Sequence, residues 1–111
     1  MDLTAHLARQ RAFALATFGP GLRDEALAAH IRKELVEVAE AGDHAHAAEE
    51  WVDVVILASE AALRRLEASG AADPAAALAE LLARKMAANE ARRWPDWREL
   101  PPGAPVEHVR D

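Results

Sequence analysis

Alanine is the feature that most limits the folds open to this sequence, because 28 of its 111 residues are alanine and none is tyrosine. Alanine has the highest helix propensity of all residues, whereas strands are built mainly from β-branched and aromatic side chains. A chain of this length also forms one domain around one hydrophobic core. The sequence therefore predicts a single all-α domain over residues 1–111.

Glycine, aspartate and proline divide the chain into four helical segments. Gly19-Pro20-Gly21 ends the first segment, Gly42-Asp43 the second and Gly70 the third. Asp73-Pro74 then supplies an N-cap followed by proline at the first helical position, where proline is well tolerated. These breaks predict a four-helix bundle-like fold with helices near residues 2–17, 23–41, 44–69 and 74–93. The prolines beyond them predict an irregular C-terminal tail over residues 94–111.

Charge and composition exclude several classes of function. The 13 lysines and arginines against 19 acidic residues give a net charge of −6, which argues against binding a nucleic acid polymer through its phosphates. The absence of cysteine excludes disulfides, thiolate metal sites and cysteine nucleophiles. The apolar run around residues 54–59 is far shorter than the ~20 residues of a membrane span, and the N-terminus lacks the basic start of a signal peptide. We therefore expect a soluble, cytoplasmic protein without a membrane partner.

Two pairs of acidic residues share one spacing. Glu34 and Glu37 lie three residues apart in the second predicted helix, and Glu50 and Asp53 repeat this spacing in the third. Side chains three apart share one face of a helix. The apolar residues on both sides of Asp53 predict that it is buried against other helices or another subunit. A buried carboxylate needs a partner, because burial of an unpaired charge costs roughly several kcal/mol of folding free energy.

That partner is a metal ion if the two helices run antiparallel. A short turn at Gly42 would then bring both acidic pairs together as a cage of four carboxylates. An all-oxygen, highly charged ligand set suits Mg²⁺ or Mn²⁺ better than zinc or copper. The alternative is that both pairs are ordinary solvated acids, which form surface ion pairs with Arg32 and Lys33.

The fourth predicted helix carries a stripe that changes from apolar to basic. Its leucines, of which Leu78 is the first, are followed at helical spacing by Lys85, Asn89 and Arg92. Lysine is a point charge, arginine a planar fork and asparagine an amide donor, and together they suit phosphate groups. The alternative is a solvated helix end whose cations only compensate the helix dipole.

Combined, these patterns resemble a known family. Glu34-x-x-Glu37 followed by Glu50-x-x-Asp53 resembles the signature of the MazG-like all-α nucleoside triphosphate pyrophosphohydrolases. Lys33 departs from this pattern, since the family often has a third glutamate there. Further segments are similar to the phage-associated dATP/dGTP pyrophosphohydrolase branch: His6-Leu7-x-Arg9-Gln10-x-x-Phe13, Thr17-Phe18-Gly19-Pro20-Gly21, His30-Ile31-Arg32-Lys33-Glu34-Leu35, Glu50-Trp51-Val52-Asp53-Val54, Lys85-x-x-x-Asn89-Glu90-x-Arg92-x-Trp94-Pro95-Asp96-Trp97-Arg98 and Glu107-His108-Val109-Arg110.

The resemblance implies an activity, a cofactor and an assembly. The activity is hydrolysis of dGTP or dATP at the α-phosphorus to the monophosphate and pyrophosphate. The catalytic and Mg²⁺-binding residues would be the four acids of the signature, Glu34, Glu37, Glu50 and Asp53, with Mn²⁺ as a substitute metal. Lys85, Asn89 and Arg92 would bind the phosphates. The resemblance also implies a homodimer or a dimer of dimers, located in the host cytoplasm if a phage encodes it.

Base recognition and assembly also have candidate residues. Phe13 and Phe18 flank the first loop and would stack on a purine, while Gln10 would contact the base edge; the alternative is that the two rings only pack in the core. The apolar stretch from Val52 to Leu63 leaves the third helix without a polar face, which predicts an interface between subunits. The alternative function for the whole chain is a non-catalytic helical dimerisation module.

Overall fold

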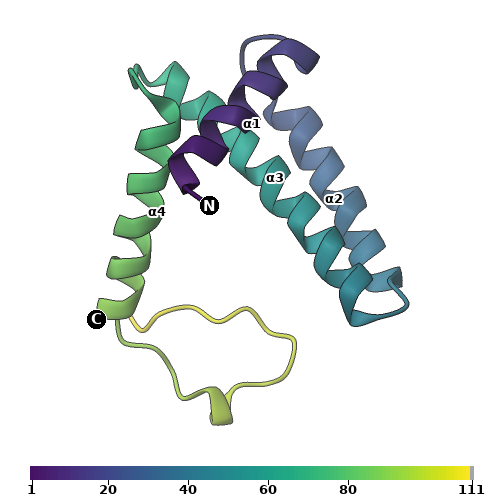
Figure 1. The fold of residues 1–111 in the computed structure, drawn as a ribbon. Coiled ribbons are helices and arrows are strands. Elements are labelled where there is room, and N and C mark those ends of the chain that lie inside the picture. The colour runs from purple at the N-terminus through teal and green to yellow at the C-terminus, as the bar shows by residue number, and fades with distance from the viewer. Residues whose placement is uncertain (111) are drawn as a thin grey trace. The chain divides into compact units, whose positions relative to one another are not determined.

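The computed structural model describes residues 1–110 and is all-helical over that range (Figure 1). Its elements are α1 (Leu3–Phe18), α2 (Asp24–Glu40), α3 (His44–Ala68), α4 (Pro74–Ala91) and a short 3₁₀-helix, η1 (Trp97–Glu99). Each α-helix begins and ends within two residues of the range expected from the sequence. The chain divides into two compact units, Met1–Ala79 and Glu80–Asp111. The last residue of the expected tail, Asp111, lies outside the described residues.

Aspartate and glycine set the helix boundaries. An aspartate side chain accepts a hydrogen bond from the backbone N–H three residues later at Asp2, Asp43 and Asp73. Such caps satisfy one of the N–H groups that a helix start leaves without a partner. At the other end of α1, Gly19 has φ 83°, a conformation that residues with a Cβ rarely adopt, and its N–H donates to Leu15.

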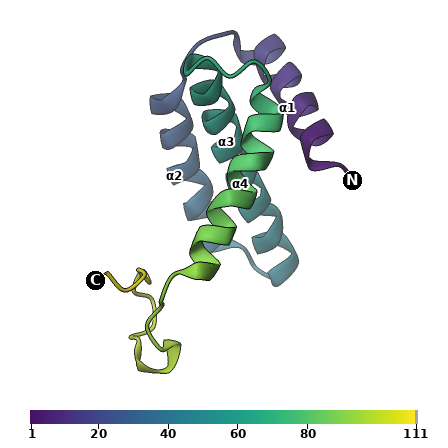
Figure 2. The ribbon, with the colours of Figure 1, turned by 90° about the vertical axis from the view of Figure 1, so that its left-hand side faces the viewer.

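In the first unit, α2 and α3 run side by side as an antiparallel pair joined by a short turn (Figures 1 and 2). Leu27 of α2 is only 2 % exposed. Leu7 of α1 meets Leu63 of α3 in a small core that also includes Ala75 and Leu78 from the start of α4. The α2–α3 pair is therefore the frame of the unit, and α1 packs across the later turns of α3.

A buried arginine fixes the loop between α1 and α2. Arg64, on α3, donates from Nη1 to the carbonyl oxygens of Gly19 and Gly21, both at 2.8 Å. Its Nε donates to Oε2 of Glu60 at 2.9 Å, and both side chains are buried. The loop carbonyls therefore have charged donors inside the protein, where unpaired carbonyls would be costly.

Much of the apolar surface of α3 stays open to solvent in the single chain. Trp51, Val52 and Val55 are each more than half exposed. Asp53 is exposed as well, so the expectation that other helices of this chain bury it is wrong. The physical reason is that α1 and α2 cover only part of α3. Burial of Asp53 by a second subunit remains a prediction.

The second unit holds most of α4 and the tail. Beyond α4, η1 is the only regular element among residues 92–110. The tail returns to the end of α4, where the N–H of Val109 donates to the carbonyl of Arg93 at 2.8 Å (Figure 1). Trp94 contributes an edge-to-face contact with His108 and an indole N–H bond to the carbonyl of Asn89. The irregular tail is thus held by specific contacts.

Among residues 1–110, no helix combines the length and apolar character of a membrane span.

Candidate functional site

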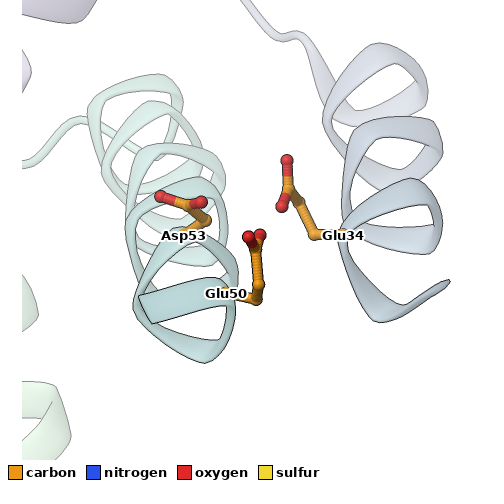
Figure 3. A group of neighbouring side chains, drawn as sticks. All are labelled: Glu34, Glu50 and Asp53. Carbon is orange, nitrogen blue, oxygen red and sulfur yellow. The ribbon is translucent and has the colours of Figure 1, made fainter. Parts of the chain in front are cut away.

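Acidic side chains from α2 and α3 come together in the first unit. Glu34 reaches from α2 toward Glu50 and Asp53 on α3, and one carboxylate oxygen from each lies within 4.8 Å of the others (Figure 3). Glu37 lies near enough to influence the pKa values of Glu34 and Glu50. The antiparallel packing of the two helices therefore brings together three of the four acids that the sequence predicts as a cage, with Glu37 nearby.

The crowding of these acids changes their protonation. A hydrogen bond with Glu34, followed by burial and by the hydrogen bond and charge of Glu37, raises the pKa of Glu50 to about 7. The pKa of Glu34 is lowered, because hydrogen bonds from Glu37, Glu50 and His30 favour its ionised form and outweigh the effect of burial. Neighbouring carboxylates cannot all ionise freely. The cluster therefore needs either a shared proton or a cation.

One oxygen of the cluster lacks a partner. Oε2 of Glu34 is buried and has no hydrogen-bond partner among residues 1–110. The other oxygen, Oε1, lies 3.1 Å from Nε2 of His30. A buried carboxylate oxygen is normally paired, and the Glu34 carboxylate lies beside those of Glu50 and Asp53. This donor set consists of oxygens from acidic side chains, which fits Mg²⁺ or Mn²⁺.

A pocket of about 270 Å³ adjoins the acidic cluster. Its walls come from α1, α2 and α3. The residues that line it are Gln10, Phe13, Ala14, Phe18, His30, Glu34, Asp53, Ile56, Leu57 and Glu60. The three residues expected from the sequence to contact a base therefore share one pocket with two of the acids. Phe13 and Phe18 pack edge to face, with ring centroids 6.2 Å apart, and both remain at least half exposed.

Contacts between side chains of different elements hold the walls of this pocket. Nε2 of Gln10 donates to the backbone carbonyl of Ile56 at 2.7 Å, which ties α1 to α3. The guanidinium of Arg23 lies 4.4 Å from the centre of the Phe18 ring and pairs with Glu60. Sequence reasoning missed Arg23 and Glu60. The available signal was the Glu60-x-x-x-Arg64 pair, which lies beside Leu63 and follows an apolar run in α3.

The predicted phosphate-binding residues belong to the second unit. Lys85 and Asn89 lie on α4, while Arg92 follows one residue after α4 ends at Ala91. Arg92 therefore lies beyond the helix, contrary to the expected range of 74–93, although Nη1 of Arg92 donates to Oδ1 of Asn89 at 3.0 Å. The structure thus brings Asn89 and Arg92 together, and Lys85 is exposed one turn earlier. Phosphate binding by these residues remains a prediction.

A family model described as dATP/dGTP pyrophosphohydrolase matches residues 7–111. The chain belongs to this family. As a member of the dATP/dGTP pyrophosphohydrolases it is a hydrolase that acts on nucleoside triphosphates, which confirms the resemblance drawn from the sequence segments and argues against a non-catalytic dimerisation module. Comparisons with curated proteins and with solved structures gave no match. All the acids of the cluster and all the lining residues of the pocket fall within the matched range.

Proposed function

We propose that this protein hydrolyses dGTP and dATP at the α-phosphorus and releases the deoxynucleoside monophosphate and pyrophosphate. One observation carries the proposal: a cluster of carboxylates with a buried unpaired oxygen opens onto a pocket that has two aromatic rings. Membership of the dATP/dGTP pyrophosphohydrolases supplies the substrate class. We assign metal binding to the cluster and nucleoside binding to the pocket.

The acidic residues are proposed to bind Mg²⁺, with Mn²⁺ as a substitute. Glu34, Glu50 and Asp53 would hold the ion, and Glu37, which influences the pKa values of Glu34 and Glu50, would complete the acidic site. Bound there, Mg²⁺ supplies positive charge that offsets the negative charge of the triphosphate and of the leaving pyrophosphate. An ionised carboxylate of the cluster accepts a proton from the attacking water.

The pocket is proposed to take the nucleoside. Its volume of about 270 Å³ lies near the lower end of the range for small-molecule sites, which is roughly 300–1,000 Å³. Phe13 and Phe18 offer exposed ring surface on which a purine can stack. Gln10 brings an amide to the same pocket. The aromatic rings thus contribute affinity and the polar side chains contribute orientation.

Lys85, Asn89 and Arg92 complete the proposal as the residues that bind the β- and γ-phosphates. The support is chemical, since a lysine, an arginine and an amide are the side chains that bind phosphate oxygens best.

Because the family match runs through both compact units, we propose that residues 1–111 act as one functional domain. Its substrates are cytoplasmic metabolites, so a cytoplasmic location is part of the proposal.

The chain is further proposed to work as a homodimer or a dimer of dimers. The exposed apolar side chains of α3, among them Trp51, Val52 and Val55, support this assembly. Exposed apolar side chains gathered on one helix usually mark a protein interface. Covering them with a second copy would also shield Asp53, which lies between Val52 and Val55 in the sequence.

The decisive experiment is an assay of the purified protein with dGTP or dATP and Mg²⁺. We expect equal amounts of pyrophosphate and deoxynucleoside monophosphate, and no reaction when a chelator removes the metal. Release of inorganic phosphate in place of pyrophosphate would show that another phosphorus is attacked. If no nucleotide is hydrolysed at all, the proposed function is wrong.

A further inference from the structure

Glu60 is the only buried acid of the pocket apart from Glu34 among the described residues. It is 6 % exposed and accepts hydrogen bonds from two arginines, Arg23 and Arg64. Both bonds reach the same oxygen, Oε2. The two guanidinium groups therefore hold the carboxylate in one position, and Oε1 is left outside both bonds.

Gln10, on α1, presents a second acceptor to the same pocket. Its Nε2 is committed to the carbonyl of Ile56, so the amide must be oriented with Oε1 away from that carbonyl. In an α-helix the carbonyl of residue 56 points toward the N–H of residue 60. Gln10 therefore binds α3 one turn before Glu60, and both side chains line the pocket. Each has an acceptor oxygen that takes no part in these bonds to the protein.

The position of Glu60 on α3 sets its distance from the acidic cluster. Asp53 and Glu60 both line the pocket and are seven residues apart on α3, or about 10 Å along the helix axis at ~1.5 Å per residue. Seven residues are also close to two full turns, which places both side chains on one face of α3. The separation is comparable with the length of a nucleoside monophosphate from its phosphate to the far edge of its base.

We propose that Glu60, together with Gln10, reads the edge of the purine and favours guanine over adenine. Guanine carries two neighbouring donors, N1–H and the 2-amino group, and so matches two acceptors. Adenine has a donor at its 6-amino group but an acceptor at N1, which faces a carboxylate oxygen unfavourably. Hypoxanthine keeps N1–H and lacks the 2-amino group. Because this inference rests on the proposed function, its test must separate the two.

The first test changes the substrate and leaves the protein intact. We expect kcat/KM with Mg²⁺ to be about 10- to 100-fold higher for dGTP than for dITP, since the lost bond is one to a charged acceptor. A higher value for dGTP than for dATP is also expected. Equal values for dGTP and dITP would overturn the role of Glu60 and would leave the hydrolytic function standing.

The second test replaces Glu60 and measures the ratio of kcat/KM for dGTP to kcat/KM for dITP. In Glu60→Gln, the arginines retain the single amide oxygen, so the NH₂ group faces the base in place of Oε1. A purely structural effect of the lost ion pairs lowers the rates for dGTP and dITP alike, whereas loss of base reading brings the dGTP/dITP ratio close to 1. A wild-type ratio in Glu60→Gln would overturn the proposal.

A control variant and a binding measurement complete the design. Glu67→Gln changes the same charge two turns further along α3, where Glu67 pairs with Arg11 and does not line this pocket. It should keep the wild-type dGTP/dITP ratio. Calorimetry with dGMP and dIMP reports on the pocket without turnover. Tighter binding of dGMP in a protein that hydrolyses no triphosphate would overturn the hydrolytic function alone, and equal binding would overturn the role of Glu60.

Discussion

Nε2 of His30 lies 3.1 Å from Oε1 of Glu34, one turn further along α2, and so engages only one oxygen of that buried carboxylate. The other oxygen, Oε2, is buried and has no hydrogen-bond partner among residues 1–110, and the Glu34 carboxylate lies beside those of Glu50 and Asp53. His30 therefore orients a carboxylate that is proposed as a metal ligand. Groups that orient metal ligands in this way are often as important for affinity as the ligands.

Removing His30 should weaken metal binding without destroying it. We expect His30→Ala to lower the affinity for Mg²⁺ by about 10- to 100-fold, because Glu34 loses its orienting bond and keeps both oxygens. The apparent Kd for Mg²⁺, taken from the dependence of turnover on metal concentration, measures this. His44→Ala is the matched control, because His44 is an exposed histidine at the start of α3 outside the cluster. Unchanged affinity in His30→Ala would contradict the role of His30.

The acidic cluster should make stability without metal depend on pH. The pKa of Glu50 is raised from 4.5 to about 7, so the folded state binds a proton that the unfolded state has already lost in this range. Its contribution to stability is therefore present at pH 4.5 and below and is lost as the pH rises toward 7. With a chelator present, the Tm should fall between pH 4.5 and pH 7, and Glu50→Gln should flatten that part of the profile. An identical slope in both proteins would contradict the assignment.

Asp53 should matter for turnover and little for folding. Its carboxylate is exposed in the single chain, so Asp53→Asn should keep the wild-type Tm in the presence of a chelator. The same change removes a proposed metal ligand and should abolish turnover of dGTP. Glu49→Gln serves as the matched control, because Glu49 is exposed on α3 and lies outside the cluster. Full turnover by Asp53→Asn would rule out the cage as described.

An exposed apolar residue on α3 should control assembly. The wild-type chain has a mass of 12.0 kDa, and sedimentation should give at least twice that value. Val55 is 60 % exposed in the single chain, so Val55→Glu should shift the protein toward the monomer without unfolding it. Ala45→Glu adds the same charge at an exposed position near the start of α3 and should not change the mass. A monomeric wild-type protein would contradict the predicted dimer.

Two adjacent arginines should differ sharply in their contribution to stability. Arg64 is buried with Glu60 and holds the carbonyls of the α1–α2 loop, so Arg64→Ala should lower the free energy of unfolding by about 3–5 kcal/mol. Arg65 makes an exposed ion pair with Asp24, so Arg65→Ala should cost less than about 1 kcal/mol. Chemical denaturation of both variants measures the difference. Similar losses would show that the buried network contributes no more than a surface pair.

The sequence was sufficient to predict the helix boundaries and the proximity of acidic residues from α2 and α3. Helix boundaries follow from local rules at residues such as Asp43 and Gly19, and the spacing of the acidic pairs fixes their faces. The clamp at Glu60 and Arg64 could not be predicted in the same way, because an acid and a base four residues apart look alike on a surface and in a core. Only the folded structure, in which Arg64 binds the carbonyls of the α1–α2 loop, shows that this pair is buried. For a related reason the sequence could not show that the helices of this chain leave Asp53 exposed, because apolar neighbours do not reveal which helix or subunit covers them.

The pairing of α2 and α3 through a short turn has a consequence for the order of folding. Glu34 and Asp53 are only 19 positions apart, whereas the bond from Gln10 to Ile56 spans 46. Closing a short loop costs less entropy than closing a long one, so we expect the hairpin that holds the acids to form before α1 docks. Repulsion among the acids therefore opposes an early step of folding, and a divalent ion that binds them would act as a nucleus for the fold as well as a cofactor.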